Sequence, residues 1–149
     1  MKNYLQNSLR ALFVCACVFF SLPILAEQVE IDGIAYNLVS KVQEATVVAR
    51  ADGKYTGSVE IPASVVHEGV TYAVTTIGKK AFYECKDMTS VAMPNSILTI
   101  ENNAFYGCRA LTSVSVPNSV TSIGYEAFRA CDRMTSINIG SGVRSIGSN

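Results

Sequence analysis

Apolar and polar residues recur with a fixed period in the second half of the chain. From Val74 onward the same residue types return every 23 positions. The aligned columns are Ile77, Ile100, Ile123 and Ile146; Ala81, Ala104 and Ala127; Phe82, Phe105 and Phe128; and Cys85, Cys108 and Cys131. A repeat of this length is typical of a solenoid, in which each unit buries its apolar side chains against its neighbours. We therefore expect three full units and a partial fourth over residues 74–149.

Residues 111–116, Leu-Thr-Ser-Val-Ser-Val, represent the strand of one unit. Their apolar spacing is that of a leucine-rich repeat. Strand side chains alternate, so Val114 and Val116 are expected to face the core and the serines beside them to face solvent. Pro117 ends the strand, because proline has no N–H to donate to a sheet.

The rest of the unit leads the chain to the next strand. Ile123 lies in a second short apolar stretch, and Gly124 permits a turn after it. Residues 126–128, Glu-Ala-Phe, indicate a short helical turn that leads to Cys131. The predicted fold class is therefore a repeat solenoid of the leucine-rich-repeat type, with mostly short β-strands, short helical turns and an N-terminal β-hairpin cap.

Residues 27–73 do not follow the repeat and are expected to form that cap. Apolar alternation on both sides of Asp32-Gly33 predicts a β-hairpin. Residues 65–72 predict a second hairpin. Such a region covers the apolar end of the first coil, which would otherwise be exposed. The other predicted strands are residues 45–49 and 59–61.

Residues 1–26 have the layout of a cleaved secretory signal peptide. Lys2 and Arg10 give a positive start, an uncharged apolar stretch of 15 residues follows, and Ala26 provides a small residue at the cleavage point. The apolar stretch is short for a membrane span, which needs about 20 residues. A retained anchor and lipidation at Cys17 are the less favoured alternatives.

Composition and charge exclude several classes of function. Charged residues make up 16% of the chain, and the hydrophobic fraction of 49% argues against disorder. Without residues 1–26, 10 basic side chains stand against 12 acidic ones, a net charge of −2. This balance gives no basis for binding nucleic acid or an anionic membrane surface through charge. We expect no membrane span after signal cleavage.

The repeat motif resembles that of a known family. Residues 111–131 read L-T-S-V-x-V-P-x-S-V-T-S-I-G-x-x-A-F-x-x-C and are similar to the BspA-like leucine-rich repeats. The resemblance covers residues 57–149, with Glu101 in place of the expected glycine. It implies a secreted or cell-surface protein of the kind common in anaerobic bacteria. It also implies adhesion to host matrix proteins or to other cells.

No set of catalytic groups is visible in the sequence, so we expect no enzymatic activity. His67 is the single histidine and is predicted at the solvated tip of the second hairpin. It has no evident carboxylate or oxyanion partner for a Ser-His-Asp site. No nucleophile elbow, phosphate-binding glycine loop or His-Glu-x-x-His motif is present. We expect neither a cofactor nor a metal.

Cys85, Cys108 and Cys131 are expected to stack in successive coils. Neighbouring strands lie about 4.8 Å apart, so one disulfide is geometrically possible. A straight column of three does not supply the tetrahedral ligand set of zinc. The favoured interpretation is a buried column of small apolar side chains, beside a buried column of phenylalanines.

Function is expected on the outer surface of the solenoid. The outward strand positions form a neutral, hydroxyl-rich face that is able to hydrogen-bond to protein backbone or to sugar hydroxyls. The alternative is that serine and threonine simply suit exposed strands. The candidate binding residues are Thr89, Ser90, Ala92, Thr112, Ser113, Ser115, Thr135, Ser136 and Asn138. More variable positions, expected on the opposite side, are Lys79-Lys80, Asn102-Asn103 and Tyr125-Glu126.

Two functions are compatible with this surface. The first is a secreted or surface-displayed protein that binds a protein or glycan partner, on a host matrix or a cell, through the solenoid face. The second is a structural repeat that stacks on another chain through an open C-terminal edge, without a ligand of its own. Secretion, surface display and a periplasmic location all agree with the predicted signal peptide.

Overall fold

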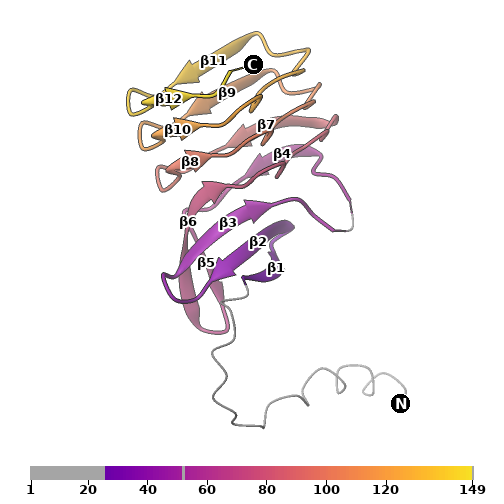
Figure 1. The fold of residues 1–149 in the computed structure, drawn as a ribbon. Coiled ribbons are helices and arrows are strands. Elements are labelled where there is room, and N and C mark those ends of the chain that lie inside the picture. The colour runs from indigo at the N-terminus through magenta and orange to yellow at the C-terminus, as the bar shows by residue number, and fades with distance from the viewer. Residues whose placement is uncertain (1–25, 52, 149) are drawn as a thin grey trace, which may run out of the picture.

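The structure, a computed structural model, describes residues 26–51 and 53–148. They form an elongated stack that begins with antiparallel hairpins and continues as regularly spaced coils (Figure 1). All regular elements are short strands. They are β1 (Glu27–Ile31), β2 (Ile34–Val39), β3 (Glu44–Val48), β4 (Gly57–Glu60), β5 (Ser64–His67), β6 (Val70–Ile77), β7 (Met88–Ala92), β8 (Thr99–Ile100), β9 (Ser113–Val116), β10 (Ser122–Ile123), β11 (Ser136–Ile139) and β12 (Ser145–Ile146).

Both predicted hairpins are present in the N-terminal cap. β1 and β2 pair antiparallel around Asp32 (φ 49°) and Gly33 (φ 78°), which are both left-handed. Two left-handed residues are the mark of a turn whose twist matches that of the flanking strands. β5 and β6 pair in the same way around Glu68 (φ 49°) and Gly69 (φ 79°). His67 is therefore the last residue of β5 and does not lie in the turn, contrary to expectation.

Two sets of parallel strands run along the stack. In the first set, β3 pairs with β6, β6 with β8, β8 with β10, and β10 with β12. In the second set, β4 pairs with β7, and β9 with β11. β6 belongs both to the cap hairpin and to the first coil, so the cap and the repeats share one continuous sheet (Figure 1).

A series of turns connects β6 to β7, and the expected short helical turn is wrong. None of the residues 26–51 and 53–148 is helical. Lys80 (φ 60°) and Glu84 (φ 54°) have a left-handed backbone. An L-residue in this conformation does not continue a right-handed helix. The equivalent residues of the next coils, Asn103, Gly107, Glu126 and Ala130, are left-handed as well.

Hydrogen bonds between coils explain this geometry. Ala81 N donates within its own coil to Gly78 O (3.1 Å), whereas Phe82 N donates to Ala104 O of the next coil (2.8 Å). Other N–H groups of this segment alternate in the same way. A helix directs its N–H groups along its own axis. The turns divide them between neighbouring coils, and this satisfies the backbone of a segment whose side chains are buried.

The phenylalanine column fills the interior of the stack. The ring centroids of Phe82 and Phe105 lie 4.9 Å apart, and those of Phe105 and Phe128 lie 5.1 Å apart. The ring planes are nearly parallel, at 10° and 4°. The expected single file of phenylalanines is confirmed. Phe82 and Phe105 have no exposed surface, because each coil covers the apolar side chains of its neighbour.

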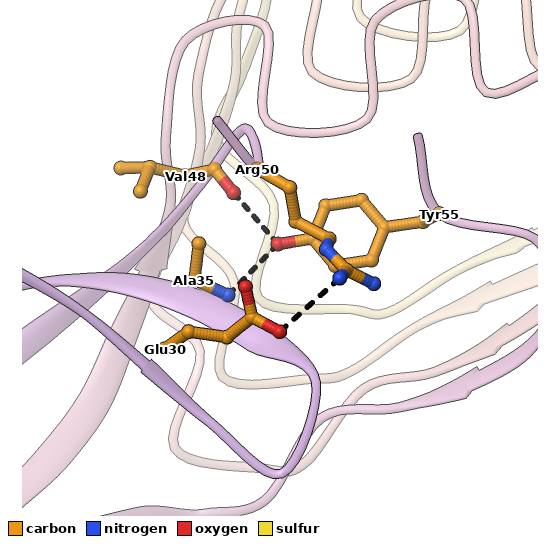
Figure 2. Close-up of polar contacts among 5 residues, drawn as sticks. All are labelled: Glu30, Ala35, Val48, Arg50 and Tyr55. Atoms are coloured by element: carbon orange, nitrogen blue, oxygen red, sulfur yellow. Dashed lines mark hydrogen bonds and ion pairs between the residues drawn. The ribbon is translucent and has the colours of Figure 1, made fainter. Parts of the chain in front are cut away.

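Tyr55 joins the cap to this core from a segment without strand structure (Figure 2). Its ring centroid lies 4.8 Å from that of Phe82 and extends the aromatic column. Its hydroxyl accepts a hydrogen bond from Ala35 N (2.9 Å) and donates one to Val48 O (2.8 Å). One side chain thus connects β2, β3 and the first coil.

Arg50 covers the outer side of this junction. Its guanidinium carbon lies 5.9 Å from the Tyr55 ring centroid, and its Nη2 lies 3.2 Å from Glu30 Oε1 on β1 (Figure 2). Burial is the largest of the effects that raise the pKa of Tyr55 to about 12. The hydroxyl therefore stays protonated at neutral pH and keeps both of its hydrogen bonds.

Candidate functional site

The predicted binding residues lie together on β7, β9, β11 and the residues that precede β9 and β11. All nine side chains are exposed. Apolar residues between them on β7 and β9, Val91 and Val114, are buried. The candidate residues therefore lie on the outside of the stack, although their role in binding stays a prediction. We call this surface the hydroxyl face; it comprises Thr89, Ser90, Ala92, Thr112, Ser113, Ser115, Thr135, Ser136 and Asn138.

Equivalent residues of the hydroxyl face are aligned across the strands. Ser113 lies opposite Ser136 in the parallel ladder of β9 and β11. Further toward the cap, Ser90 Oγ donates a hydrogen bond to Ser58 Oγ on β4 (2.9 Å). A hydroxyl has one donor and two acceptor positions. The aligned hydroxyl groups are therefore able to hydrogen-bond to a partner even where they bond to one another.

The hydroxyl face is uncharged along the coils and meets a carboxylate at its N-terminal end. Glu60, the last residue of β4, pairs with Ala92 in the ladder of β4 and β7. The same row continues through Ser115 and Asn138, which oppose each other in β9 and β11. Glu60 is exposed. A partner that lies along this row meets neutral polar groups and, at the cap, a negative charge.

A second surface follows β8, β10 and β12. It is a shallow groove of about 700 Å³. The turns beyond the strands contribute Lys79, Glu101, Asn102 and Tyr125 to its lining, and Tyr125 is 47% exposed. A concave surface with an aromatic ring and a few convergent polar groups is a common form of ligand site. The groove is therefore a second candidate surface.

The close approach of neighbouring coils explains why residue 124, beside this groove, is a glycine. A Cβ on Gly124 would lie 2.4 Å from Asn102 N, a distance at which the backbone has to move. Gly124 does not have a left-handed φ, so its small size matters here and not the turn geometry that the sequence indicates. At the equivalent place in the preceding coil, Glu101 Oε2 accepts a hydrogen bond from Lys79 N (2.7 Å).

A polar cluster around Glu126 borders the groove. Its carboxylate accepts hydrogen bonds from Asn103 Nδ2 (3.1 Å), from Arg129 Nη1 and from the Tyr125 hydroxyl. Desolvation by itself raises the pKa of Glu126, but the three donors outweigh it and lower the pKa. The carboxylate is therefore ionised at neutral pH and holds Tyr125 at the rim of the groove.

The cysteine column lies mainly inside the stack, where Cys85 and Cys108 are buried and Cys131 is half-buried. Cys85, Cys108 and Cys131 are free thiols. Cys108 Sγ donates to Phe82 O (3.1 Å), and Cys131 Sγ donates to Phe105 O (3.3 Å). Burial raises the pKa of all three thiols, that of Cys131 to about 11. Protonated thiols are poor nucleophiles, so the column serves packing.

Other candidate chemistry is sparse in the part of the chain that the structure describes. His67 is half-buried, and its Nε2 lies 3.7 Å from Glu27 Oε1 on the neighbouring hairpin. Among the described residues, no group of three or more His, Cys, Asp or Glu side chains is arranged to hold a metal ion. No helix in this part is long and apolar enough to cross a membrane. The predicted signal peptide lies outside the described residues, apart from Ala26.

Short parallel strands that stack with a repeat of 23 residues define a leucine-rich-repeat protein. The BspA type leucine-rich repeat region matches residues 69–149, which are more than half of the chain. The chain therefore belongs to the BspA type leucine-rich repeat family, as its sequence motif indicates. No curated protein matches the chain.

Solved structures of bacterial proteins share this fold. A leucine-rich repeat protein from Bacteroides ovatus is 30% identical, with a TM-score of 0.74 over 80% of this chain and 31% of that one. A leucine-rich repeat protein from Bacteroides capillosus is 23% identical (TM-score 0.54; 75% and 97% covered). The pneumococcal vaccine antigen PcpA is 16% identical (TM-score 0.56; 83% and 41%). This chain spans less than a third of the B. ovatus protein, and the other two show the fold alone.

The groove beside β8, β10 and β12 was not predicted. Lys79, Asn102 and Tyr125 share one position of the repeat, and their different side chains mark that position as variable. Variation at one position of the repeat indicates that the position is on the surface. It does not reveal a concave shape, because the shape depends on how closely the coils approach at residues such as Gly124.

Proposed function

We propose that this protein is a non-catalytic binding module that recognises a protein partner through the hydroxyl face. The observation that carries the proposal is the alignment of nine exposed, uncharged side chains over successive coils. A solenoid presents such an extended surface on a rigid frame, so a partner loses little binding energy to ordering of the site. Membership of a leucine-rich repeat family agrees, since such repeats typically serve protein interaction.

The place of action that we propose is outside the cytoplasm, by secretion or display on the cell surface. The layout of residues 1–26 and the resemblance to BspA-like proteins support export. The partner is then a protein of a host matrix or of another cell, and a glycan is the second ligand class. Cell fractionation with protease treatment of intact cells tests the location. Full protection of the protein inside the cytoplasm would contradict it.

Binding of residues 27–149 to arrayed extracellular matrix proteins and glycans tests the function. We expect saturable binding to at least one arrayed protein. The variant Ser113→Lys/Ser115→Lys places two bulky cations in the middle of the hydroxyl face and is expected to abolish this binding. Leu98→Lys/Thr121→Lys adds the same charge at exposed positions elsewhere and is the matched control. Absence of saturable binding, or equal binding by both variants, would contradict the proposal.

A further inference from the structure

A row of hydroxyl groups lines the groove that follows β8, β10 and β12. Each of the three strands contributes one residue to it, namely Thr99, Ser122 and Ser145. These residues lie opposite one another in the parallel ladders. The Ser122 hydroxyl donates a long hydrogen bond of 3.5 Å to Thr99 Oγ1. A hydroxyl has one donor and two acceptor positions, so most of this hydrogen-bonding capacity is open to a ligand.

Tyr125 supplies an aromatic ring that the structure holds at two points. The side chain lines the groove and is 47% exposed. Its backbone N–H donates to Asn102 Oδ1 (2.8 Å), and its hydroxyl donates to the carboxylate of Glu126. That carboxylate is fixed in turn by Asn103 and Arg129. A ring held in this way loses little conformational freedom when a ligand packs on it.

The remaining polar groups of the groove carry no net charge. Asn102 accepts through Oδ1, and its Nδ2 donates to none of the described residues. Glu101 accepts from Lys79 N through Oε2 (2.7 Å), and both of these side chains are exposed. The lining therefore includes one carboxylate and one ammonium group, which balance each other. The groove offers donors and acceptors to a ligand without favouring either sign of charge.

This combination of groups indicates a sugar. A hexopyranose has a C–H face that packs on an aromatic ring and hydroxyl groups that both donate and accept hydrogen bonds. An apolar ligand would leave the hydroxyl row and the Asn102 amide without partners, which is unfavourable. A charged ligand would gain little from the balanced pair of Lys79 and Glu101. An aromatic ring with a few convergent polar groups is thus best matched by a neutral saccharide.

The spacing of the strands indicates a chain of sugars. β8, β10 and β12 follow one another along the stack (Figure 1). Neighbouring strands of a sheet lie about 4.8 Å apart, so the row of hydroxyl groups repeats at this step. The step is close to the length of one unit in an extended β-1,4-linked chain of pyranoses. Successive sugar units of such a chain meet equivalent groups of successive coils.

We propose that the groove binds an extended, β-1,4-linked chain of neutral hexopyranoses that crosses β8, β10 and β12. One sugar unit packs on the Tyr125 ring and accepts a hydrogen bond from Asn102 Nδ2. The hydroxyl groups of the neighbouring units bond to Ser122 and Thr99. This inference goes beyond the proposed function and does not depend on it, because the groove and the hydroxyl face belong to different strands.

The test uses three β-1,4-linked probes: cellohexaose, mannohexaose and chitohexaose. Each is titrated into the ¹⁵N-labelled protein and followed by NMR. We expect saturable shifts of the Ser122 and Tyr125 amide resonances with at least one probe, and no shifts of Ser113 and Ser136 on the hydroxyl face. Maltohexaose has an α-1,4-linked, curved chain and is expected to bind at least about tenfold more weakly. No shift at the groove with any of the three probes, or equally tight binding of maltohexaose, would overturn the proposal.

Variants test the two groups that contact the first sugar unit. Tyr125→Ala is expected to raise the dissociation constant of the bound probe at least about tenfold. Asn102→Asp keeps an oxygen that accepts from Tyr125 N but removes the Nδ2 donor, and it is also expected to weaken binding. Val66→Ala shortens an apolar side chain in the cap that is 61% exposed, and it is the control. Unchanged affinity in a folded Tyr125→Ala or Asn102→Asp protein, or equal weakening in Val66→Ala, would contradict the assignment.

Failure of this inference is distinguishable from failure of the proposed function. The variant Ser113→Lys/Ser115→Lys is expected to keep the full affinity for the β-1,4-linked probe. A loss of that affinity would show that the saccharide binds the hydroxyl face, and this would overturn the groove proposal. A protein that binds the hydroxyl face, together with no saccharide bound in the groove, would overturn this inference and leave the proposed function intact.

Discussion

Single side chains connect the cap strands and the coils of this molecule to one another. Tyr55 does so by bonding to β2 and β3 (Figure 2) and by contacting the ring of Phe82. The free thiols of the cysteine column do so by donating to carbonyl groups of the preceding coil, as Cys108 does to Phe82. At this scale the structure makes two quantitative predictions, one for the Tyr55 hydroxyl and one for the thiols.

Replacement of Tyr55 by phenylalanine removes the hydroxyl and leaves the aromatic ring. The buried Ala35 N–H then loses its acceptor. We expect Tyr55→Phe to lower the free energy of unfolding by about 1–3 kcal/mol, measured by urea denaturation. Tyr83→Phe is the control. The Tyr83 ring stacks on that of Tyr106, with the centroids 5.1 Å apart, and loss of its hydroxyl is expected to change the free energy of unfolding by less than about 0.5 kcal/mol. Equal effects of the two changes would contradict this role of Tyr55.

The thiol column predicts a loss of stability in alkaline solution. Unfolded thiols release their protons near pH 9, whereas burial raises the pKa of Cys131 to about 11. Above pH 9 the unfolded chain therefore binds fewer protons than the native protein, and stability falls as the pH rises. We expect Cys108→Ala/Cys131→Ala to flatten the decline in the free energy of unfolding between pH 9 and 11. An unchanged slope would show that the thiols do not contribute.

At the scale of elements, the strands were predictable and the turns were not. Alternation of apolar residues and the fixed repeat identify strands such as β9, because both signals are local. Residues 126–128 resemble a helical turn because alanine and glutamate favour helices. Their conformation depends on hydrogen bonds to the next coil, as Glu126 N makes to Ser148 O (3.1 Å). A tertiary contact of this kind overrides local propensity.

The spacing between neighbouring coils is sensitive to Gly124, the residue that follows β10. We expect Gly124→Ala to lower the free energy of unfolding by about 1–3 kcal/mol, because its Cβ collides with the backbone of Asn102. Gly53→Ala is the control, since no atom lies within 4 Å of its added Cβ. Thermal unfolding of both variants measures the difference. An unchanged free energy of unfolding in Gly124→Ala would show that the coils are able to move apart without loss of stability.

At the scale of the whole molecule, one stack presents two separate surfaces. The hydroxyl face lies along β7, β9 and β11, and the groove follows β8, β10 and β12. Much of the hydroxyl face was predictable from the sequence, because strand alternation places residues such as Ser113 and Ser115 outside. The groove was not predictable, because it depends on residues that are distant in sequence.

The measurement that tests the account most directly is the affinity of the protein for the partner found by the array. It compares Ser113→Lys/Ser115→Lys with the equally charged control Leu98→Lys/Thr121→Lys. If the hydroxyl face is the recognition surface, the dissociation constant rises at least about tenfold in the first variant only. An unchanged dissociation constant in the first variant, in a protein that remains folded, would show that recognition occurs elsewhere.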